Sequence, residues 1–339
     1  MLAKTLHIST SPHLKKNIST PSIMFNVVGA LMPTVLFAVY AFGLPALLVI
    51  ATSVLSCVLT EYALCVASKK ESTIGDGSAI ITGLLLGMTL PPIFPLWMAF
   101  IGGVIAIALG KFVFGGLGYN VFNPALVGRA VLQAAFPVAI TTWYPAFLEN
   151  RFSVLPSSLL ALPFMEPEFD GISGATPLSA WKFDGVAAPP SDLALGLISG
   201  SAGETCAILI LLGGLWLVFR NMMNWRIPVA ILVTVAVMSG FFHWLDATRY
   251  PSALFMLFSG GLMLGAVFMA TDMVASPLTT KGVIVYGVFI GILVVVIRLW
   301  GGLPEGVMYA ILLANAVSPH IDKLFQNRVY GTTKRKQSP

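Results

Sequence analysis

The chain has 339 residues, of which 57% are hydrophobic and only 10% charged, and its formal net charge is +5. A soluble globular protein carries about 25% charged residues, so this composition excludes a water-exposed surface over most of the chain. Mean hydropathy is +0.89, and apolar runs near the length of a membrane-crossing helix recur along the sequence. The composition predicts an all-α polytopic protein of the lipid bilayer and gives no indication of nucleic-acid binding.

Residues 1–22 form a basic arm, and the apolar run that follows lacks a small-residue cleavage site, so we expect a retained cytoplasmic arm and not a signal peptide. Hydropathy then predicts ten transmembrane spans, in chain order roughly 23–42, 44–67, 78–91, 94–114, 121–139, 203–219, 226–244, 252–271, 282–300 and 305–318. The third and tenth are short and contain Gly or Pro. We expect helices broken inside the protein there, where protein or a cavity surrounds the backbone.

The distribution of basic residues predicts the orientation of the spans. With the N-terminus inside, fourteen of the nineteen Lys and Arg residues fall in inside segments, as the positive-inside rule requires. The long segment 140–202 then lies outside the cytoplasm, with six acidic and two basic residues. Both termini, including a basic tail at 319–339, are predicted to be cytoplasmic.

Two pairs of segments indicate an internal repeat. The stretch "SAIITGLLLGMTLPP" is loosely similar to "SGGLMLGAVFMATDMVASP", and "NVFNPALVGRAVL" is similar to "YAILLANAVSPHI". We therefore predict two membrane repeats of five helices, residues 23–139 and 203–318, the second inverted because five is odd. Inverted repeats place functional sites at their interface, on broken helices.

The external segment contains the polar stretch "DGISGATPLSAWK", residues 170–182. Thr176 precedes a proline, which favours an extended backbone, and the preceding Gly174 and Ala175 add little bulk. We interpret the Thr176 hydroxyl as an acceptor that a modifying enzyme must reach. The alternative is an ordinary turn, since Gly, Ser, Asp and Pro are common in turns. The full pattern D-x-x-[ST]-G-A-T, however, arises by chance in roughly one such chain in a thousand.

This pattern matches the signature on which flavin transferases attach FMN to threonine through a phosphoester. Together with ten spans, "FNPALVGRAVL" and "MATDMVASPLT", it makes the chain resemble the D subunits of the Rnf complexes (Rsx in some bacteria) over residues 20–325. The sister family is the B subunit of the sodium-pumping NADH:quinone oxidoreductase. That family usually has a longer N-terminal extension, so the Rnf family is favoured.

The resemblance implies an electron-transfer subunit of a bacterial inner-membrane complex that couples NADH:ferredoxin-type oxidoreduction to movement of Na+ or H+. It implies covalent FMN on Thr176, attached by a flavin transferase within a motif made of Asp170, Ser173, Gly174, Ala175 and Thr176. It also implies a second, non-covalent flavin, a riboflavin, within the membrane domain.

The sequence has no nucleotide-binding Gly-rich motif after a strand and no cysteine cluster. The NADH and iron–sulfur sites must then lie on partner subunits, which the resemblance implies are a flavoprotein G-type, iron–sulfur B- and C-type, and membrane A- and E-type subunits. Enzyme activity is expected of the complex, and the chain alone is expected to be inactive.

Asn120 and Asn123 match riboflavin-site asparagines of the sister family. Spaced three apart, they would share one helical face, and amides can hydrogen-bond the polar atoms of a flavin ring. The alternative is that Asn123 only caps the helix beginning at Pro124.

Charged residues at membrane depth are functional candidates. Asp272 is a candidate for an ion path, and Arg129 for pairing with a carboxylate or a flavin oxygen. Glu61 and Arg298 are expected to be helix-end residues that reach interfacial water. Glu204 is a further candidate without an assigned role.

Two other functions remain open from the sequence. A small-solute channel or secondary transporter fits inverted repeats and broken helices equally well, but it has no need of an acceptor threonine. The quinone-reducing sister complex is the other, and partner subunits would distinguish it.

Overall fold

The computed structural model describes residues 19–70, 72–163, 174–204 and 206–326. These residues form helices and connecting loops, and within them the only β pairing is a single bridge between Trp143 and Gly174. Four of the described helices are long and apolar enough to cross a membrane: α1 (Thr20–Phe42), α2 (Leu44–Ala67), α10 (Arg226–Leu245) and α13 (Thr280–Trp300). An all-helical, membrane-type architecture is thereby confirmed.

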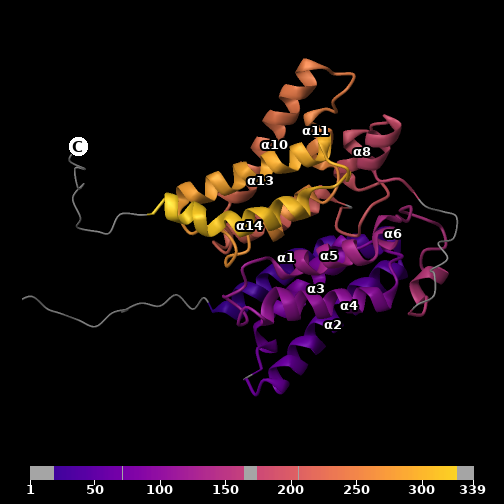
Figure 1. Ribbon diagram of the computed structural model, residues 1–339. Coiled ribbons are helices and arrows are strands. Elements are labelled where there is room, and N and C mark those ends of the chain that lie inside the picture. Colours follow the sequence, from indigo (N-terminus) through magenta and orange to yellow (C-terminus); the bar gives the residue numbers. More distant parts are fainter. Residues whose placement is uncertain (1–18, 71, 164–173, 205, 327–339) are drawn as a thin grey trace, which may run out of the picture.

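The first half of the chain forms one bundle (Figure 1). After α1 and α2 come the short η1 (Ile74–Asp76), α3 (Ser78–Thr89), α4 (Leu96–Ile107) with its π-helical extension η2 (Ala108–Phe112), and α5 (Pro124–Ala135). Helix α2 packs against α3 and α4, and α4 packs against α5. Gly43, with a φ of 76°, makes the sharp turn between α1 and α2.

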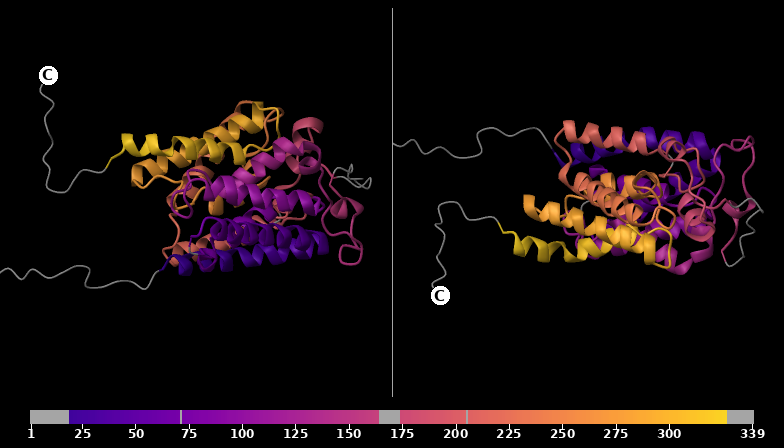
Figure 2. Two further views of the ribbon diagram at one scale, coloured as in Figure 1. Left: turned by 60° about the horizontal axis from the view of Figure 1, so that its bottom comes forward. Right: turned by 90° about the horizontal axis from the view of Figure 1, so that it is seen from above.

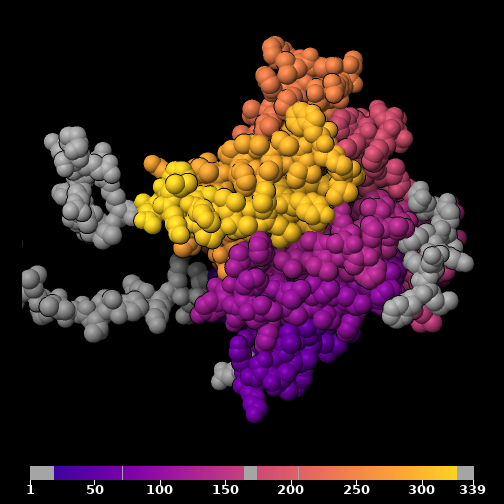
Figure 3. Space-filling view, in the orientation of Figure 1, coloured from indigo at the N-terminus to yellow at the C-terminus, as the bar shows by residue number. Residues whose placement is uncertain are grey.

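The second half forms a bundle beside the first. It contains α9 (Ala207–Phe219), α10, α11 (Ala253–Phe258), α12 (Leu262–Leu264), the π-helical η5 (Gly265–Met269), α13 and α14 (Val307–Leu324). Helix α10 packs against α11 and α13, and α13 packs against α14. The halves meet where α1 contacts α9 and α14 contacts α5. Figure 3 shows the yellow surface of the second half lying against the magenta surface of the first.

The segment between the bundles contains only short helices: α6 (Pro137–Thr141), η3 (Ser157–Leu160), α7 (Pro177–Ser179), η4 (Ala180–Asp184) and α8 (Pro190–Leu195). In Figures 1 and 2, α6 and α8 lie at one end of the molecule, while the start of α1 and the end of α14 lie at the other. The linking segment therefore lies at the opposite end of the bundles from the start of α1 and the end of α14.

The breaks in the helices differ from those predicted. The tenth span is the continuous helix α14, and the third is the unbroken α3, whose 12 residues extend about 18 Å. The break falls in the eighth span, between α11 and α12, where Gly260 has a φ of 62°. The Gly260–Gly261 pair permits this sharp turn, which a residue with a side chain would make under strain.

Glycines allow the closest helix approaches in the first bundle. A Cβ built on Gly83 of α3 would overlap the Val54 Cα of α2, and one on Gly87 would lie 2.8 Å from Ile50 Cα. Small residues let helix backbones approach closely, which is how helices associate in lipid without a hydrophobic driving force. The α2–α3 contact therefore requires glycine.

We expect Gly83→Ala to destabilise the protein by about 1–3 kcal/mol, because the added methyl meets backbone that cannot move aside as a side chain can. The melting temperature of the detergent-purified protein measures this. Gly29→Ala is the matched control, since a Cβ there meets no atom within 4 Å. Equal melting temperatures for both variants would contradict the packing argument.

Candidate functional site

Thr176 begins the short helix α7. Its backbone is extended, with φ −68° and ψ 153°, as predicted for a residue before proline. Its hydroxyl oxygen accepts a hydrogen bond from the Ser179 backbone N–H at 3.2 Å and lies 3.0 Å from the Ser179 hydroxyl. The residue therefore serves as the N-cap of α7.

The expectation of an openly displayed hydroxyl is wrong. Thr176 is only 7% exposed, because the Pro177 and Leu178 that follow it pack into the protein. It lines a cavity of about 320 Å³ formed with Trp143, Phe183 and residues of the second half. Any group attached to this hydroxyl must occupy or leave through that cavity.

The rest of the predicted motif is described in part. Asp170 and Ser173 lie outside the described residues. Gly174 donates its N–H to the Trp143 carbonyl at 3.0 Å, and a Cβ there would lie 2.6 Å from the Ser199 hydroxyl. Ala175 is exposed beside Thr176. A side chain at this position would push against Ser199 where the segment passes that loop.

Charged side chains line the same cavity. Arg129, from α5, forms an ion pair of 2.7 Å with Glu305, from the loop before α14, as predicted for Arg129. The other Glu305 oxygen accepts the Gly261 N–H at 2.6 Å. Glu204, 5% exposed, is a second carboxyl at the cavity wall. Sequence reasoning missed Glu305, the first residue of the predicted tenth span, which the structure places in the loop before α14.

The prediction that Arg298 reaches interfacial water is wrong. It is fully buried and donates to the Met256 carbonyl at 2.5 Å and the Ser259 carbonyl at 2.8 Å. Those carbonyls end α11 and have no helical partner. The guanidinium therefore supplies the donors that the break between α11 and α12 requires.

Lys182 attaches the segment that carries Thr176 to the membrane bundle. From η4, its ammonium donates to the carbonyls of Arg298, Gly301 and Leu303 at 3.1, 2.5 and 3.0 Å. These carbonyls lie at and just beyond the C-terminus of α13, where the helix dipole favours a cation. Burial lowers the pKa of Lys182, because leaving water disfavours the charged form.

A second cavity, of about 120 Å³, lies at the other end of the bundles, between the start of α1 and the loop after η5. Its lining is mainly apolar, and its polar members are Ser78, Thr82, Lys111, Asn120, Asn123, Thr271 and Asp272. A mainly apolar wall with a few polar groups is typical of sites for small organic ligands.

Asn120 and Asn123 both line this cavity. The prediction that they share a helical face is wrong, because α5 begins only at Pro124. Asn123 caps that helix, accepting the N–H of Ala125 at 3.0 Å. Asn120 lies in the preceding loop and donates to Asp272 at 3.2 Å. The fold thus brings Asn120 and Asp272 together from opposite halves of the sequence.

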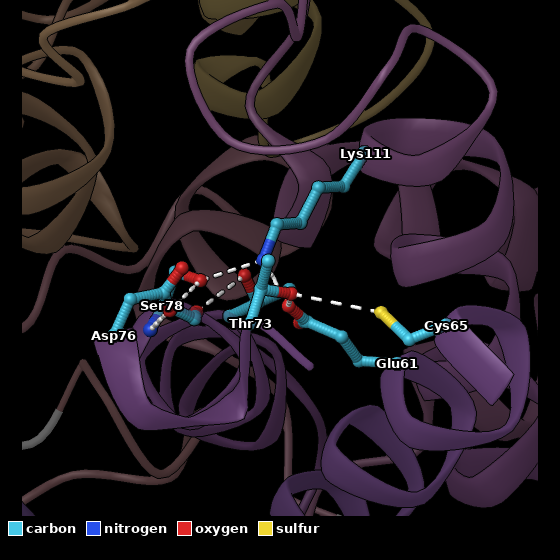
Figure 4. A network of polar contacts seen from close by, with 7 residues as sticks. Glu61, Cys65, Thr73, Asp76, Ser78 and Lys111 are labelled. Carbon is cyan, nitrogen blue, oxygen red and sulfur yellow. Dashed lines mark hydrogen bonds and ion pairs between the residues drawn. The ribbon is translucent and has the colours of Figure 1, made fainter. Parts of the chain in front are cut away.

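Glu61 was also expected to reach interfacial water, but it is 2% exposed. Its carboxylate pairs with Lys111 of η2 at 2.7 Å and accepts a hydrogen bond from Thr73. Lys111 also donates to the Ser78 hydroxyl at 2.6 Å (Figure 4). A carboxylate buried within an apolar run requires a cation as its partner. The position of Glu61 in the sequence could therefore have predicted that a lysine such as Lys111 pairs with it.

The described residues contain no cluster of His, Cys, Asp and Glu able to hold a metal ion. Cys57, Cys65 and Cys206 are buried and free, in agreement with packing roles. Two cavities lie at opposite ends of the bundles: one has the Thr176 hydroxyl and the Arg129–Glu305 ion pair in its wall, and the other is mainly apolar with amide and carboxyl groups.

Known proteins match almost the whole chain. A family model described as the NQR2, RnfD, RnfE family matches residues 7–331. The D subunit of the proton-translocating ferredoxin:NAD(+) oxidoreductase complex of Clostridium ljungdahlii is 43% identical, over 96% of each chain. The D subunit of the Na(+)-translocating ferredoxin:NAD(+) oxidoreductase complex of Acetobacterium woodii is 41% identical, over 98% of this chain and 97% of that one. The D subunit of the ion-translocating oxidoreductase complex of Halorhodospira halophila is 39% identical, over 95% of each chain.

Replacing Lys111 by Met should destabilise the protein by about 3–5 kcal/mol, because the Glu61 carboxylate is left buried without a cation. The double variant with Glu61→Gln should recover most of that loss, since no charge then remains. Thermal unfolding in detergent measures both. Lys281→Met, at an exposed lysine, is the control. A double variant as unstable as the Lys111 single variant would contradict the ion-pair account.

Proposed function

The chain belongs to the NQR2, RnfD, RnfE family, and on that basis we propose that it is the electron-transferring D-type subunit of an ion-translocating oxidoreductase complex. The relatives named as D subunits of ferredoxin:NAD(+) oxidoreductase complexes match over nearly their full length. The described residues offer a threonine hydroxyl beside one cavity and amide and carboxyl groups in a second. An electron carrier within a larger complex accounts for these features together.

We propose that Thr176 carries FMN through a phosphoester to its hydroxyl, attached by a flavin transferase. The supporting observation is that this hydroxyl, within the D-x-x-[ST]-G-A-T pattern, lines the 320 Å³ cavity. When bound, the flavin supplies the electron-transfer chemistry and the protein supplies position and electrostatics. The residues fit such a group: Trp143 and Phe183 offer aromatic walls, and Arg129 has a buried Nε without a hydrogen-bond partner.

We also propose that the non-covalent riboflavin binds at the second cavity, whose 120 Å³ are less than the roughly 300–1,000 Å³ of a typical ligand site, so that neighbouring side chains must move to admit the ring. Its apolar lining would receive a planar ring, and Asn120 and Asp272 offer donor and acceptor groups that now bond each other. Asn123 is less able to bond the ring, because its oxygen caps α5 and its nitrogen donates to the Met269 carbonyl at 3.1 Å. Asn120 and Asp272 are therefore the main polar contacts proposed for the ring.

Ten spans in two inverted repeats, bounded at 23–139 and 203–318, remain our proposal for the membrane domain. Helix contacts support it: α2 packs on α4 as α10 packs on α13, and α4 packs on α5 as α13 packs on α14. The broken segment from α11 to η5 takes the place of α3. We place the termini in the cytoplasm and the 140–202 segment outside, in the bacterial inner membrane, from the distribution of basic residues.

The partners we propose are G-type flavoprotein, B- and C-type iron–sulfur, and A- and E-type membrane subunits. The coupling ion is left as Na+ or H+, because the names of two similarly close relatives specify different ions. A solute transporter would leave the Thr176 motif unexplained. A quinone-reducing complex is less favoured, since these relatives are named for ferredoxin and NAD(+).

Thr176→Leu should abolish the covalent flavin completely, because no hydroxyl remains to form the phosphoester. On a denaturing gel of protein from cells containing the flavin transferase, the ultraviolet-fluorescent band at this chain's mass should disappear. Thr142→Leu, at a nearby threonine outside the motif, should keep it. A bare Thr176 in the wild-type peptide by mass spectrometry would exclude the proposal.

Asn120→Leu should weaken binding of the non-covalent flavin by about fivefold, since one hydrogen bond contributes about 1 kcal/mol. The flavin released from the folded, purified protein by denaturation measures occupancy, while the covalent band serves as the internal reference. Asn150→Leu, at an exposed asparagine, is the control. Unchanged release from the Asn120 variant would place the second flavin elsewhere.

A further inference from the structure

The Thr176 hydroxyl has two roles that conflict in the folded protein. It is the proposed point of FMN attachment, and it is also a buried helix cap: Thr176 is 7% exposed, and its Oγ accepts the Ser179 N–H at 3.2 Å. The cavity beside it, of about 320 Å³, is near the lower limit of small-ligand sites, which is roughly 300 Å³. It therefore has room for a small group, but not for the active site of a second protein that must contact the hydroxyl.

Residues 174–184, which we call the acceptor segment, are held at both ends by elements outside it. At the start, the Gly174 N–H donates to the Trp143 carbonyl at 3.0 Å. At the end, the Lys182 ammonium donates to three carbonyls at and just beyond the C-terminus of α13, at 3.1, 2.5 and 3.0 Å. These hydrogen bonds are lost when the segment moves away from the bundles.

Two apolar side chains hold the middle of the acceptor segment. Leu178 is 2% exposed and packs at the break between α11 and α12, where a Cβ built on Gly260 would lie 2.7 Å from its Cδ1. The Trp181 ring lies 6.4 Å from the Phe255 ring of α11, centroid to centroid. The segment is therefore docked on the second bundle by apolar burial as well as by Lys182.

The acceptor segment has little structure of its own. Its helices α7 and η4 have three and five residues, and helices this short are not stable in isolation. Its position therefore depends on the contacts with the bundles. Segments held by a few such contacts open locally while the rest of the protein stays folded.

We propose that the flavin transferase modifies Thr176 while the acceptor segment is undocked, and that release of Lys182 from the end of α13 controls how often this state forms. Redocking then encloses the attached group in the cavity. This inference rests on the proposed FMN attachment and adds the conformation in which the attachment is made. Undocking also frees the Thr176 oxygen from its role as the cap of α7.

The transfer itself balances with a flavin dinucleotide as donor, because forming a phosphoester requires an activated phosphate. The bond between the Thr176 oxygen and the flavin phosphorus forms as the phosphoanhydride bond of the donor breaks. The nucleoside monophosphate leaves, and the hydroxyl proton passes to a base of the transferase. No electron is gained or lost in this step.

The rate of modification of the folded chain tests the proposal. The full chain is purified in detergent from cells without the transferase and is then mixed with purified transferase and FAD. Lys182→Met should acquire the fluorescent band at least about fivefold faster than wild type, the change expected from one lost hydrogen bond. Lys182→Arg, which keeps a cation, should be slower than Lys182→Met. Equal initial rates for wild type and Lys182→Met would overturn the proposal.

Asp184→Asn is the matched control for the transferase assay. Asp184 is an exposed charge in the same acceptor segment, so its replacement alters the surface that the transferase meets but removes none of the anchoring contacts described above. Its rate should equal that of the wild type. A rate as high as that of Lys182→Met would show that the segment's surface charge, and not its release, sets the rate.

Hydrogen exchange without the transferase gives a second readout, which separates undocking from recognition by the enzyme. Amides of residues 177–184 should exchange faster in Lys182→Met by about the same factor as the modification rate, with exchange in α13 unchanged. Unchanged exchange in the segment, or faster exchange without faster modification, would refute the inference.

Trp181→Leu keeps the test usable if Lys182→Met fails to fold, because it weakens the contact with Phe255 instead. It should show the same paired increase in exchange and in modification. A different result decides the FMN attachment itself: if the wild type acquires no fluorescent band even in cells that contain the transferase, the attachment is refuted.

Discussion

The ion pair between Arg129 and Glu305 is the contact on which the arrangement of the cavity beside Thr176 depends. It joins α5 of the first bundle to the loop before α14 of the second, over 176 residues of sequence. Because both side chains are largely buried, each charge requires the other, and neither half can move away without leaving an uncompensated ion. The wall beside Thr176 is therefore built from both halves, and the cavity exists only where they are held together.

The same requirement explains the irregular backbone around that cavity. Polar groups in a membrane protein must find partners within the protein. The carbonyls at the end of α11 are bonded by Arg298, and the Gly203 N–H donates to the Met88 carbonyl at 2.6 Å, at the end of the short α3. Side chains and loops thus take the place of missing helical hydrogen bonds. Of the two carboxyls at this cavity, only Glu204 has an oxygen without a hydrogen bond from the described residues.

Much of the helical architecture follows from the sequence alone, because long apolar runs have few alternatives in a bilayer. The positions of the breaks do not, since Gly260 and Gly261 act through local backbone freedom that hydropathy does not measure. The extended backbone of Thr176 follows from Pro177, whereas its burial depends on tertiary packing of Leu178. The cap at Asn123 could be predicted because Pro124 follows it. The pairing of Asn120 with Asp272, 152 residues apart, required the fold.

Lys182 connects the segment that carries Thr176 to the second bundle. Its ammonium binds three carbonyls at the end of α13, six residues of chain away from Thr176. An axial displacement of α13 would be transmitted through this lysine to α7. The hydroxyl at the start of α7 would then move with a membrane helix, so a displacement within the second bundle has a direct route to the proposed point of FMN attachment.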